Sequence, residues 1–228
     1  MANATTDIRL AFRGRVERIV MPIQASTKMY MGVSATRDSS GNIGVQTANE
    51  RFMGFVTETI DNSNGATALA GRDVELYHRG SFLLTISGAL AADEGKAVFC
   101  GADDQTHSYN PKAAQFIGNV EQFDSTGKAW VRVENPGSKN WNTWATLADD
   151  AELALPVAEE AIVTVIGGSN GGVFHVDTAG AVTKLSGTTN AVASDQDVKL
   201  CVYDAGTYAS VKNRLGSSQT IAIAYHAI

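Results

Sequence analysis

The sequence predicts an all-β protein with two domains, a short linker and at most one short helix. Runs rich in Val, Ile, Phe, Tyr and Thr alternate with turn clusters about every 8–12 residues, which is typical of sandwiches and barrels. Only 18% of the 228 residues are charged, whereas 22 are glycine, the residue that tight turns favour. Residues 135–140 contain no apolar side chain and centre on Pro136-Gly137, which predicts a linker. We therefore expect two β-sandwich or barrel-like domains, over residues 1–137 and 138–228.

The N-terminal domain is expected to begin with a free arm, because residues 1–14 show neither a strand nor a helix period. Turn clusters then separate the expected strands, over residues 16–23, 29–34, 52–59, 73–77, 81–86, 96–100, 116–123 and 128–133. Polar and apolar residues alternate on both sides of Ser125-Thr126-Gly127, which makes this turn the clearest expected hairpin.

The C-terminal domain is expected to be a small β-sandwich. Residues 146–155 predict one or two helical turns that end before Pro156. Six strands follow, over residues 161–166, 172–178, 181–185, 198–203, 208–213 and 220–226. The glycine-rich residues 167–172 predict a long hairpin loop, because a phosphate loop would need a helix after it and a strand follows instead.

Composition and motifs argue against several classes of function. A net charge of −6 does not suit a nucleic-acid-binding protein, and no stretch is apolar for long enough to predict a membrane span. The first residues do not have the pattern of a secretory signal. The four histidines stand outside known catalytic and metal-binding motifs, so we expect a non-enzyme without cofactor or metal.

An enzyme remains the alternative through Asp103, Asp104 and His107, which could act in a hydrolase. The simpler interpretation is a solvated turn, because acidic residues in turns bond their own backbone. Cys100 and Cys201 each stand within an apolar strand pattern, which predicts two buried structural thiols. A disulfide between them would join the two domains and would need an oxidising compartment.

Two groups of residues are candidates for binding. Four arginines fall within ten residues near the N-terminus, namely Arg9, Arg13, Arg15 and Arg18. They are either incidental charge on an exposed arm or a segment that an acidic protein surface would order, since arginine dominates interfacial ion pairs. Trp141 and Trp144 follow the linker and could be interface anchors or pack between the domains.

Short motifs spaced along residues 20–134 resemble those of the small β-rich capsid decoration (cement) proteins of tailed bacteriophages. They are Gly54-Phe55-Val56, Asp61-Asn62, Gly65-Ala66, Gly71-Arg72-Asp73-Val74-Glu75-Leu76, Gly80-Ser81-Phe82, Ile86-Ser87-Gly88-Ala89, Asp93-Glu94-Gly95-Lys96-Ala97-Val98-Phe99, Asp103-Asp104-Gln105-Thr106, Ile117-Gly118-Asn119-Val120 and Gly127-Lys128-Ala129-Trp130-Val131. In the C-terminal half, Lys212-Asn213-Arg214-Leu215-Gly216-Ser217 and the strand after it are similar to β-sandwich appendages on phage head and tail fibres.

The resemblance implies a structural virion protein, because members of the family are not enzymes. It would bind the major capsid protein on the outer capsid surface, stabilise the capsid and assemble as a homotrimer. The four arginines would then bind the shell, and the C-terminal domain would project outward. The alternative is a head- or tail-fibre-type module whose C-terminal domain binds a host cell-surface glycan.

Overall fold

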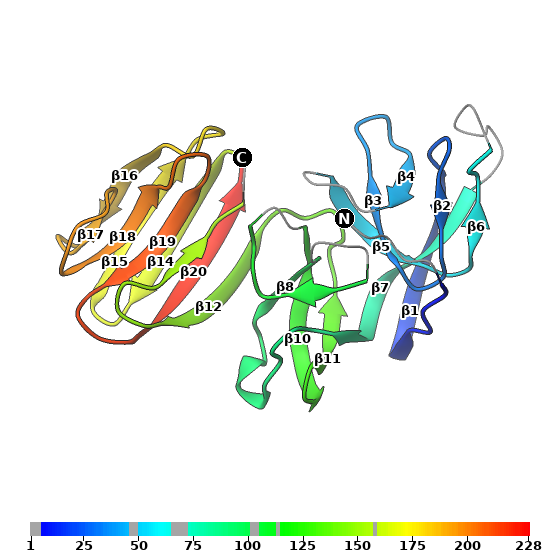
Figure 1. Ribbon diagram of the computed structural model, residues 1–228, viewed down its shortest axis with the longest axis horizontal. Helices are drawn as coiled ribbons and strands as arrows, with labels where there is room; N and C mark the ends of the chain where they lie inside the picture. Colours follow the sequence, from blue (N-terminus) through cyan, green and yellow to red (C-terminus); the bar gives the residue numbers. More distant parts are fainter. Residues whose placement is uncertain (1–5, 46–49, 65–72, 101–104, 113–114, 157–158) are drawn as a thin grey trace. The chain divides into compact units, whose positions relative to one another are not determined.

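The computed structural model describes residues 6–45, 50–64, 73–100, 105–112, 115–156 and 159–228. Strands make up 59% of the structure, and the one helix among the described residues is the short 3-10 helix η1 (Ala91–Asp93). This confirms the predicted all-β class (Figure 1). The chain divides into two compact units. Unit 1 comprises residues 1–109 and 114–138, and unit 2 comprises residues 110–113 and 139–228. The division at 138/139 lies one residue after the boundary expected from the sequence.

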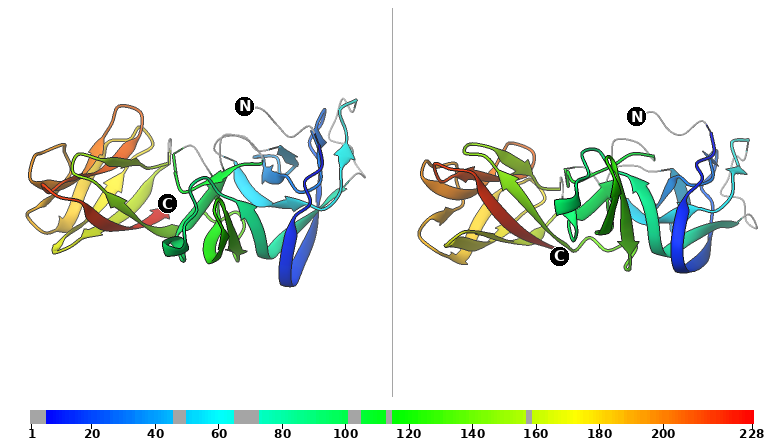
Figure 2. Two further views of the ribbon diagram at one scale, coloured as in Figure 1. Left: turned by 60° about the horizontal axis from the view of Figure 1, so that its bottom comes forward. Right: turned by 90° about the horizontal axis from the view of Figure 1, so that it is seen from below.

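Unit 1 is built on one curled, mainly antiparallel nine-stranded sheet, in which eight strands follow the order β4-β3-β5-β7-β11-β10-β8-β9 and β1 also pairs with β7 (Figures 1 and 2). The strands are β1 (Ala11–Pro22), β3 (Ser34–Arg37), β4 (Ile43–Val45), β5 (Arg51–Val56), β7 (Asp73–Thr85), β8 (Ala97–Cys100), β9 (His107–Ser108), β10 (Phe116–Ser125) and β11 (Lys128–Val133). A separate pair consists of β2 (Lys28–Met29) and β6 (Ile60–Asp61). The predicted turn at Ser125-Thr126-Gly127 joins β10 to β11.

The core of unit 1 contains two clusters of buried apolar side chains. One includes Phe52, Phe55 and Phe82, whose rings lie 5.2 Å and 5.0 Å apart between centroids in succession. The other lies around Ile23, Met29 and further aliphatic side chains. Burying this apolar surface is the main favourable term in the folding of unit 1.

Strand β7 is the centre of this sheet, because it pairs with β1, β5 and β11. The sequence suggested two strands interrupted by a turn at His78-Arg79-Gly80, whereas the structure has one continuous strand of 13 residues. Gly80 has a φ of +146°, a conformation open to glycine but unfavourable for other residues. A β-carbon there would come within 3.0 Å of the Val16 Cγ2 atom. Glycine therefore keeps β7 continuous where a turn was expected.

The expected free arm over residues 1–14 is wrong for its described part. β1 begins at Ala11, and its first pairs are Ala11 with Leu83 and Phe12 with Phe82. Ahead of it, the Ile8 amide donates to the Met31 carbonyl oxygen at 2.7 Å. The Ile8 side chain packs against one core cluster and that of Leu10 against the other. Its partners lie far along the chain, so the local sequence pattern does not indicate them.

Unit 2 is a sandwich of two sheets, as expected. The five-stranded sheet has the order β12-β20-β14-β15-β16 and the four-stranded sheet has the order β13-β19-β18-β17. Their strands are β12 (Trp141–Leu147), β13 (Glu152–Ala154), β14 (Ala161–Gly167), β15 (Asn170–Val176), β16 (Val182–Gly187), β17 (Ala191–Val192), β18 (Lys199–Asp204), β19 (Ala209–Arg214) and β20 (Gln219–Ala227). All six predicted strands are present within a few residues of their expected ends. The hairpin predicted at residues 167–172 is present, but its loop is shorter than expected, because β14 ends at Gly167 and β15 begins at Asn170.

The predicted helical turns over residues 146–155 are wrong, because this segment ends β12, turns and forms β13. Asn213, in the facing strand β19, fixes the turn. Its side-chain amide donates to the carbonyl oxygens of Leu147 and Ala148 at 2.9 and 3.2 Å. Its backbone carbonyl accepts from the Asp150 amide at 2.7 Å. Long-range pairing thus overrides a short helical propensity.

Both cysteines are free and buried, Cys100 in unit 1 and Cys201 in unit 2. This agrees with the expected structural thiols. The Cys201 thiol lies 3.3 Å from the backbone carbonyl oxygen of Gln196, and burial is the main cause that raises the pKa of this thiol. A raised pKa disfavours the reactive thiolate.

Deleting residues 1–14 is expected to destabilise unit 1, because it removes the first pairs of β1 and the packing of Ile8 and Leu10. Losing this partly buried aliphatic packing and strand pairing should lower the free energy of unfolding by about 2 kcal/mol or more. Thermal and urea unfolding would measure the loss. The exposed side chain of Arg9 serves as the control, and Arg9→Ala should unfold like the wild type. A deletion variant of unchanged stability would contradict the packing described.

Candidate functional site: a charged groove on unit 1

A bulge in β1 shapes a groove on unit 1. Arg13 pairs with Ser81 and Glu17 pairs with Arg79, so three residues of β1 lie opposite Gly80 alone. An excess of residues on one strand of a pair bends that strand and re-aims its side chains. Gly14, at the start of the bulge, has a φ of +71°, which glycine adopts at little cost. Arg15 follows it on the exposed bulge.

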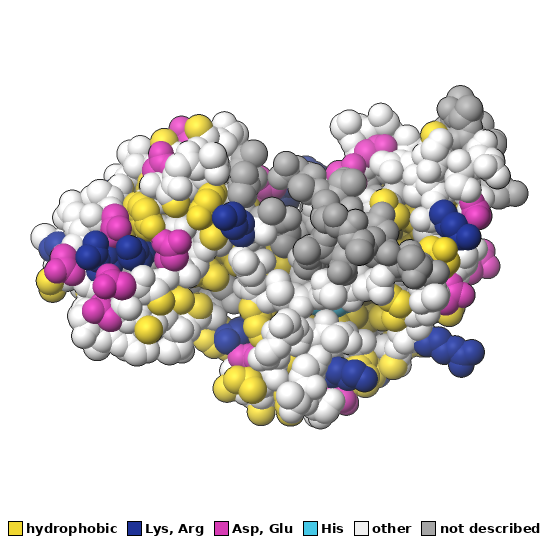
Figure 3. All heavy atoms as spheres, in the orientation of Figure 1, with side chains coloured by type: hydrophobic (Ala, Val, Ile, Leu, Met, Phe, Trp, Pro, Cys, Tyr) yellow, Lys and Arg dark blue, Asp and Glu magenta, His cyan; other side chains and the backbone are white. Residues whose placement is uncertain are grey.

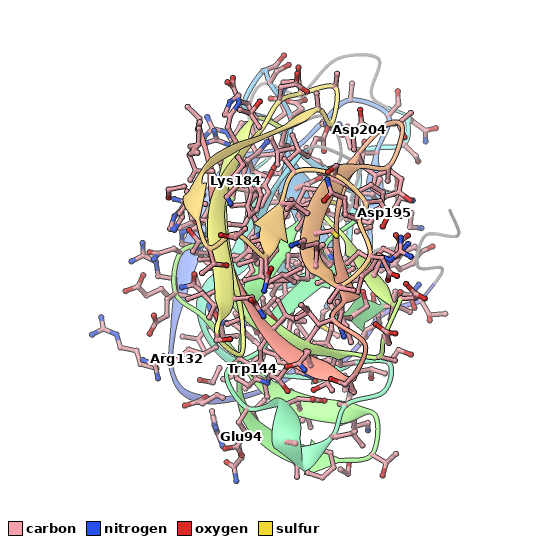
Figure 4. The ribbon with its side chains drawn as sticks, turned by 90° about the vertical axis from the view of Figure 1, so that its left-hand side faces the viewer. Glu94, Arg132, Trp144, Lys184, Asp195 and Asp204 are labelled. Carbon is pink, nitrogen blue, oxygen red and sulfur yellow. The ribbon has the colours of Figure 1, made fainter. Side chains whose placement is uncertain are left out.

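The groove has a volume of about 650 Å³ and lies between the bulge of β1, the middle of β7 and the facing parts of β10 and β11. Its charged lining residues are Arg13, Arg15, Glu17, Arg79, Glu121, Arg132 and Glu134. Four guanidinium groups thus face three carboxylates. Figure 3 shows basic and acidic side chains scattered over the visible face of unit 1, and Figure 4 labels Arg132, one of the lining arginines.

Arg13 is held inside this groove by three contacts. Its guanidinium donates to the Glu121 carboxylate at 2.9 Å and to the Gln122 side chain at 2.6 Å. Its Cζ atom also lies 4.7 Å from the centre of the Trp130 ring, a cation–π distance. Glu121 lies 3.6 Å from Arg132 as well, so its carboxylate joins two arginines.

The environment of Glu121 stabilises its ionised form. A hydrogen bond from the Ser81 side chain is the largest cause that lowers the pKa of Glu121 below its ordinary value, and Arg13 and Arg132 lower it further. Partial burial acts in the opposite direction but is weaker than the three favourable contacts together. The groove thus contains a fixed negative charge between two arginines.

The four arginines predicted as a group have different surroundings. Arg13 is paired as described, and Arg18 pairs with Glu75 at 3.1 Å while lying 5.1 Å from the centre of the Tyr77 ring. Arg9 and Arg15 are exposed, and no described residue forms an ion pair with either. The structure brings Arg13 and Arg15 into one groove, and it places Arg18 outside its lining.

The two tryptophans predicted as interface anchors lie on opposite faces of β12. Trp141 is only 4% exposed and stacks on Tyr225 inside unit 2, with ring centroids 5.0 Å apart. Its buried position makes it part of the core of this unit. Trp144 is partly exposed and points to the outer face of the same sheet.

The residues of the enzyme alternative do not form a described catalytic group. Asp103 and Asp104 lie outside the described residues. His107 is 5% exposed, with Nδ1 3.1 Å from the Thr85 carbonyl oxygen and Nε2 3.4 Å from the Ser34 hydroxyl. These two contacts hold the His107 ring against strands β7 and β3 of the sheet. In the described part of the chain, no three His, Cys, Asp or Glu side chains are placed to hold a metal ion.

Comparison of the chain with protein-family models, curated proteins and solved structures finds no match. Within the described residues, no helix is long and apolar enough to cross a membrane.

The sequence did not reveal the other half of the groove. Ser81, Glu121 and Arg132 are 68 or more positions from Arg13 along the chain, and only the pairing of β7 with both β1 and β11 brings them together. Alternation in the β10–β11 hairpin could have indicated that their polar side chains share a face. It could not have indicated that this face meets β1.

Glu121→Gln is expected to lower the free energy of unfolding near neutral pH and to make it depend less on pH in the acid range. A carboxyl with a lowered pKa stabilises the fold above its unfolded pKa, ordinarily 4.5, and that contribution disappears as pH falls through the folded pKa. The difference between wild type and variant should therefore shrink on acidification below about pH 4.5. Urea unfolding over a pH series measures it. A difference independent of pH would contradict the ionic role of Glu121.

Proposed function

We propose that this protein is a structural virion protein that binds the outside of a phage capsid as a decoration protein and stabilises it. The resemblance of residues 20–134 to cement proteins supports this function. The observation that carries it is the charged groove of unit 1, whose arginines outnumber its carboxylates and whose bulge presents Arg15 without an ion-pair partner among the described residues.

The surplus arginine determines what the groove can bind. Glu17 lies 3.5 Å from Arg79, Glu121 pairs with Arg13, and Glu134 pairs with Arg132 at 2.8 Å. With the three carboxylates occupied, Arg15 is the cation left for a ligand. A guanidinium binds a carboxylate through two parallel hydrogen bonds, so an acidic segment of the shell protein is the partner that fits.

The contribution of each such contact to the free energy of binding depends on how far it is shielded from water. An exposed ion pair contributes about 0–1 kcal/mol, whereas a hydrogen bond to a charged group that is shielded from water contributes about 1.5–3 kcal/mol. Arg15 is exposed but lines the groove, so an acidic segment seated there would itself shield the contact with Arg15 from water, whereas Arg9 lies on the chain before β1. We therefore expect Arg15 to contribute more than Arg9 to attachment. Each contribution would be repeated in every copy of the protein that binds the shell.

Charge reversal should show this order. Arg15→Glu is expected to lower occupancy on undecorated heads about tenfold or more, corresponding to about 1.4 kcal/mol per site, and Arg9→Glu is expected to lower it less. Both losses should be largest at low salt, where exposed charges are least screened. Co-sedimentation with the heads, quantified by gel, measures occupancy.

The matched control is Arg51→Glu, because Arg51 is another exposed arginine of unit 1 and lies outside the lining of the groove. Its occupancy should equal that of the wild type, and all three variants should melt like the wild type. Equal occupancy for Arg15→Glu and wild type at every salt concentration would remove the groove from attachment. Failure of the wild-type protein to bind heads would contradict the proposed function itself.

A further inference from the structure

Strand β1 is an edge of the sheet in unit 1, because among the described residues it pairs with β7 alone. It covers one side of β7 from Asp73 to Leu83, so β5 and β11 pair with β7 along the other side. Figure 1 shows β1, in dark blue, beside β7. The outward side of β1 is therefore a row of backbone N–H and C=O groups that can pair with a further strand.

The hydrogen bonds of β7 identify which groups of β1 point outward. The Glu75 carbonyl oxygen accepts from the Thr57 amide at 3.1 Å, so the backbone of Glu75 faces away from β1. Residues opposite each other in an antiparallel pair either exchange hydrogen bonds or both point away. Val20 is the residue of β1 opposite Glu75, so its N–H and C=O point away from β7. Arg18, two positions earlier in the same register, has the same orientation.

Side chains along this edge alternate between two faces. Those of Ile19 and Met21 pack against a core cluster, and the backbone groups of these two residues face β7. On the outer face, Arg18 pairs with Glu75, whereas Val20 is 59% exposed. Natural sheets usually cover or charge such an edge. An exposed apolar side chain beside unpaired backbone groups therefore favours a docking edge.

Two features confine this edge to a short segment. The bulge at residues 14–16 interrupts the ladder at one end, and Pro22, which has no N–H, closes the other end. Features of this kind prevent indiscriminate pairing of edges. Residues 18–21 between them keep a regular register with β7. The edge can therefore take one short strand but not a long one.

We propose that this edge binds an acidic segment of the shell protein as an added β-strand. The inference rests on the proposed function and specifies how the partner is held. Charge complementarity favours this occupant, because β1 contains three arginines and one glutamate in a chain whose net charge is −6. Hydrogen bonds to the backbone would supply affinity, and alternate side chains would supply specificity.

The two faces of the edge specify the chemistry of the added strand. Apolar side chains on its inner face would lie beside Ile19 and Met21 and extend the core. Acidic side chains on its outer face would lie beside Arg18. Arg15 is three positions from Arg18, or about 10 Å of extended chain, so one acidic strand can reach both guanidinium groups. The added strand thus links the edge to the groove.

A second copy of β1 fits this edge less well. Two copies paired through it would bring the arginines of both strands together, and like charges across a strand pair are destabilising. A partner that alternates acidic and apolar residues has the opposite effect at every second position.

Val20→Pro tests the added strand on undecorated heads. Proline removes the outward N–H but leaves the pairing with β7, because proline is tolerated where the N–H of an edge strand faces solvent. Losing this hydrogen bond should lower occupancy about fivefold or more. The matched control is Val20→Thr, which keeps the N–H and the β-branched shape and should bind like the wild type. Thermal melts should show both variants folded.

A peptide of alternating glutamate and valine tests the edge without heads. Fluorescence anisotropy should show that it binds the wild type and binds Val20→Pro about fivefold or more weakly. A peptide of alternating lysine and valine should not bind. Hydrogen exchange followed by NMR should slow at the amides of Arg18 and Val20 when the acidic peptide is added.

Several results would overturn the proposal. They are equal binding of Val20→Pro and wild type, a wild type that binds neither peptide or both alike, and binding without protection of the Arg18 and Val20 amides. A wild-type dimer that Val20→Pro dissociates, without peptide binding, would assign the edge to a second copy instead. Wild type that does not bind heads would contradict the proposed function, and the peptide would still decide whether the edge accepts an acidic strand.

Discussion

The long strand β7 is the constraint on which unit 1 depends. Its 13 residues must stay extended across Gly80 so that β1, β5 and β11 can each pair with it. A side chain at position 80 would meet Val16 on the neighbouring bulge. The bulge, the groove and the position of Arg15 therefore follow from one backbone conformation. The same pairing orders the segment ahead of β1, because Ile8 and Leu10 then reach the core.

Distribution of charge gives the two units different surfaces. In unit 1, the carboxylates of the groove each pair with an arginine, and Arg15 remains available at the bulge. In unit 2, the ion pairs of Asp195 with Lys212 and Arg214 lie beside β18 and β19. An anionic partner is the complement of the groove of unit 1.

Local turn chemistry made unit 2 predictable from its sequence. Its strands are linked by tight turns such as Asp177–Gly180, where the Asp177 carboxylate accepts from the Ala179 and Ala181 amides. The helical interpretation of residues 146–155 failed because Asn213, more than 60 positions away, holds that turn. The start of β1 was missed for the same reason, since its partner β7 is far along the chain. In the groove, Arg13 and Arg15 could be found by their spacing, but Ser81 and Glu121 could not.

Hydrogen exchange of the backbone amides of β1 tests the central claim most directly, because the groove exists only if β1 is a strand of the sheet. Exchange measured by mass spectrometry should show, within residues 18–21, the amides of Ile19 and Met21 protected to a degree similar to their partners in β7. The amides of the bulge should exchange faster. Exchange throughout residues 6–22 at the rate of an unstructured chain would contradict the account, because the arginines would then belong to a free arm and no groove would form.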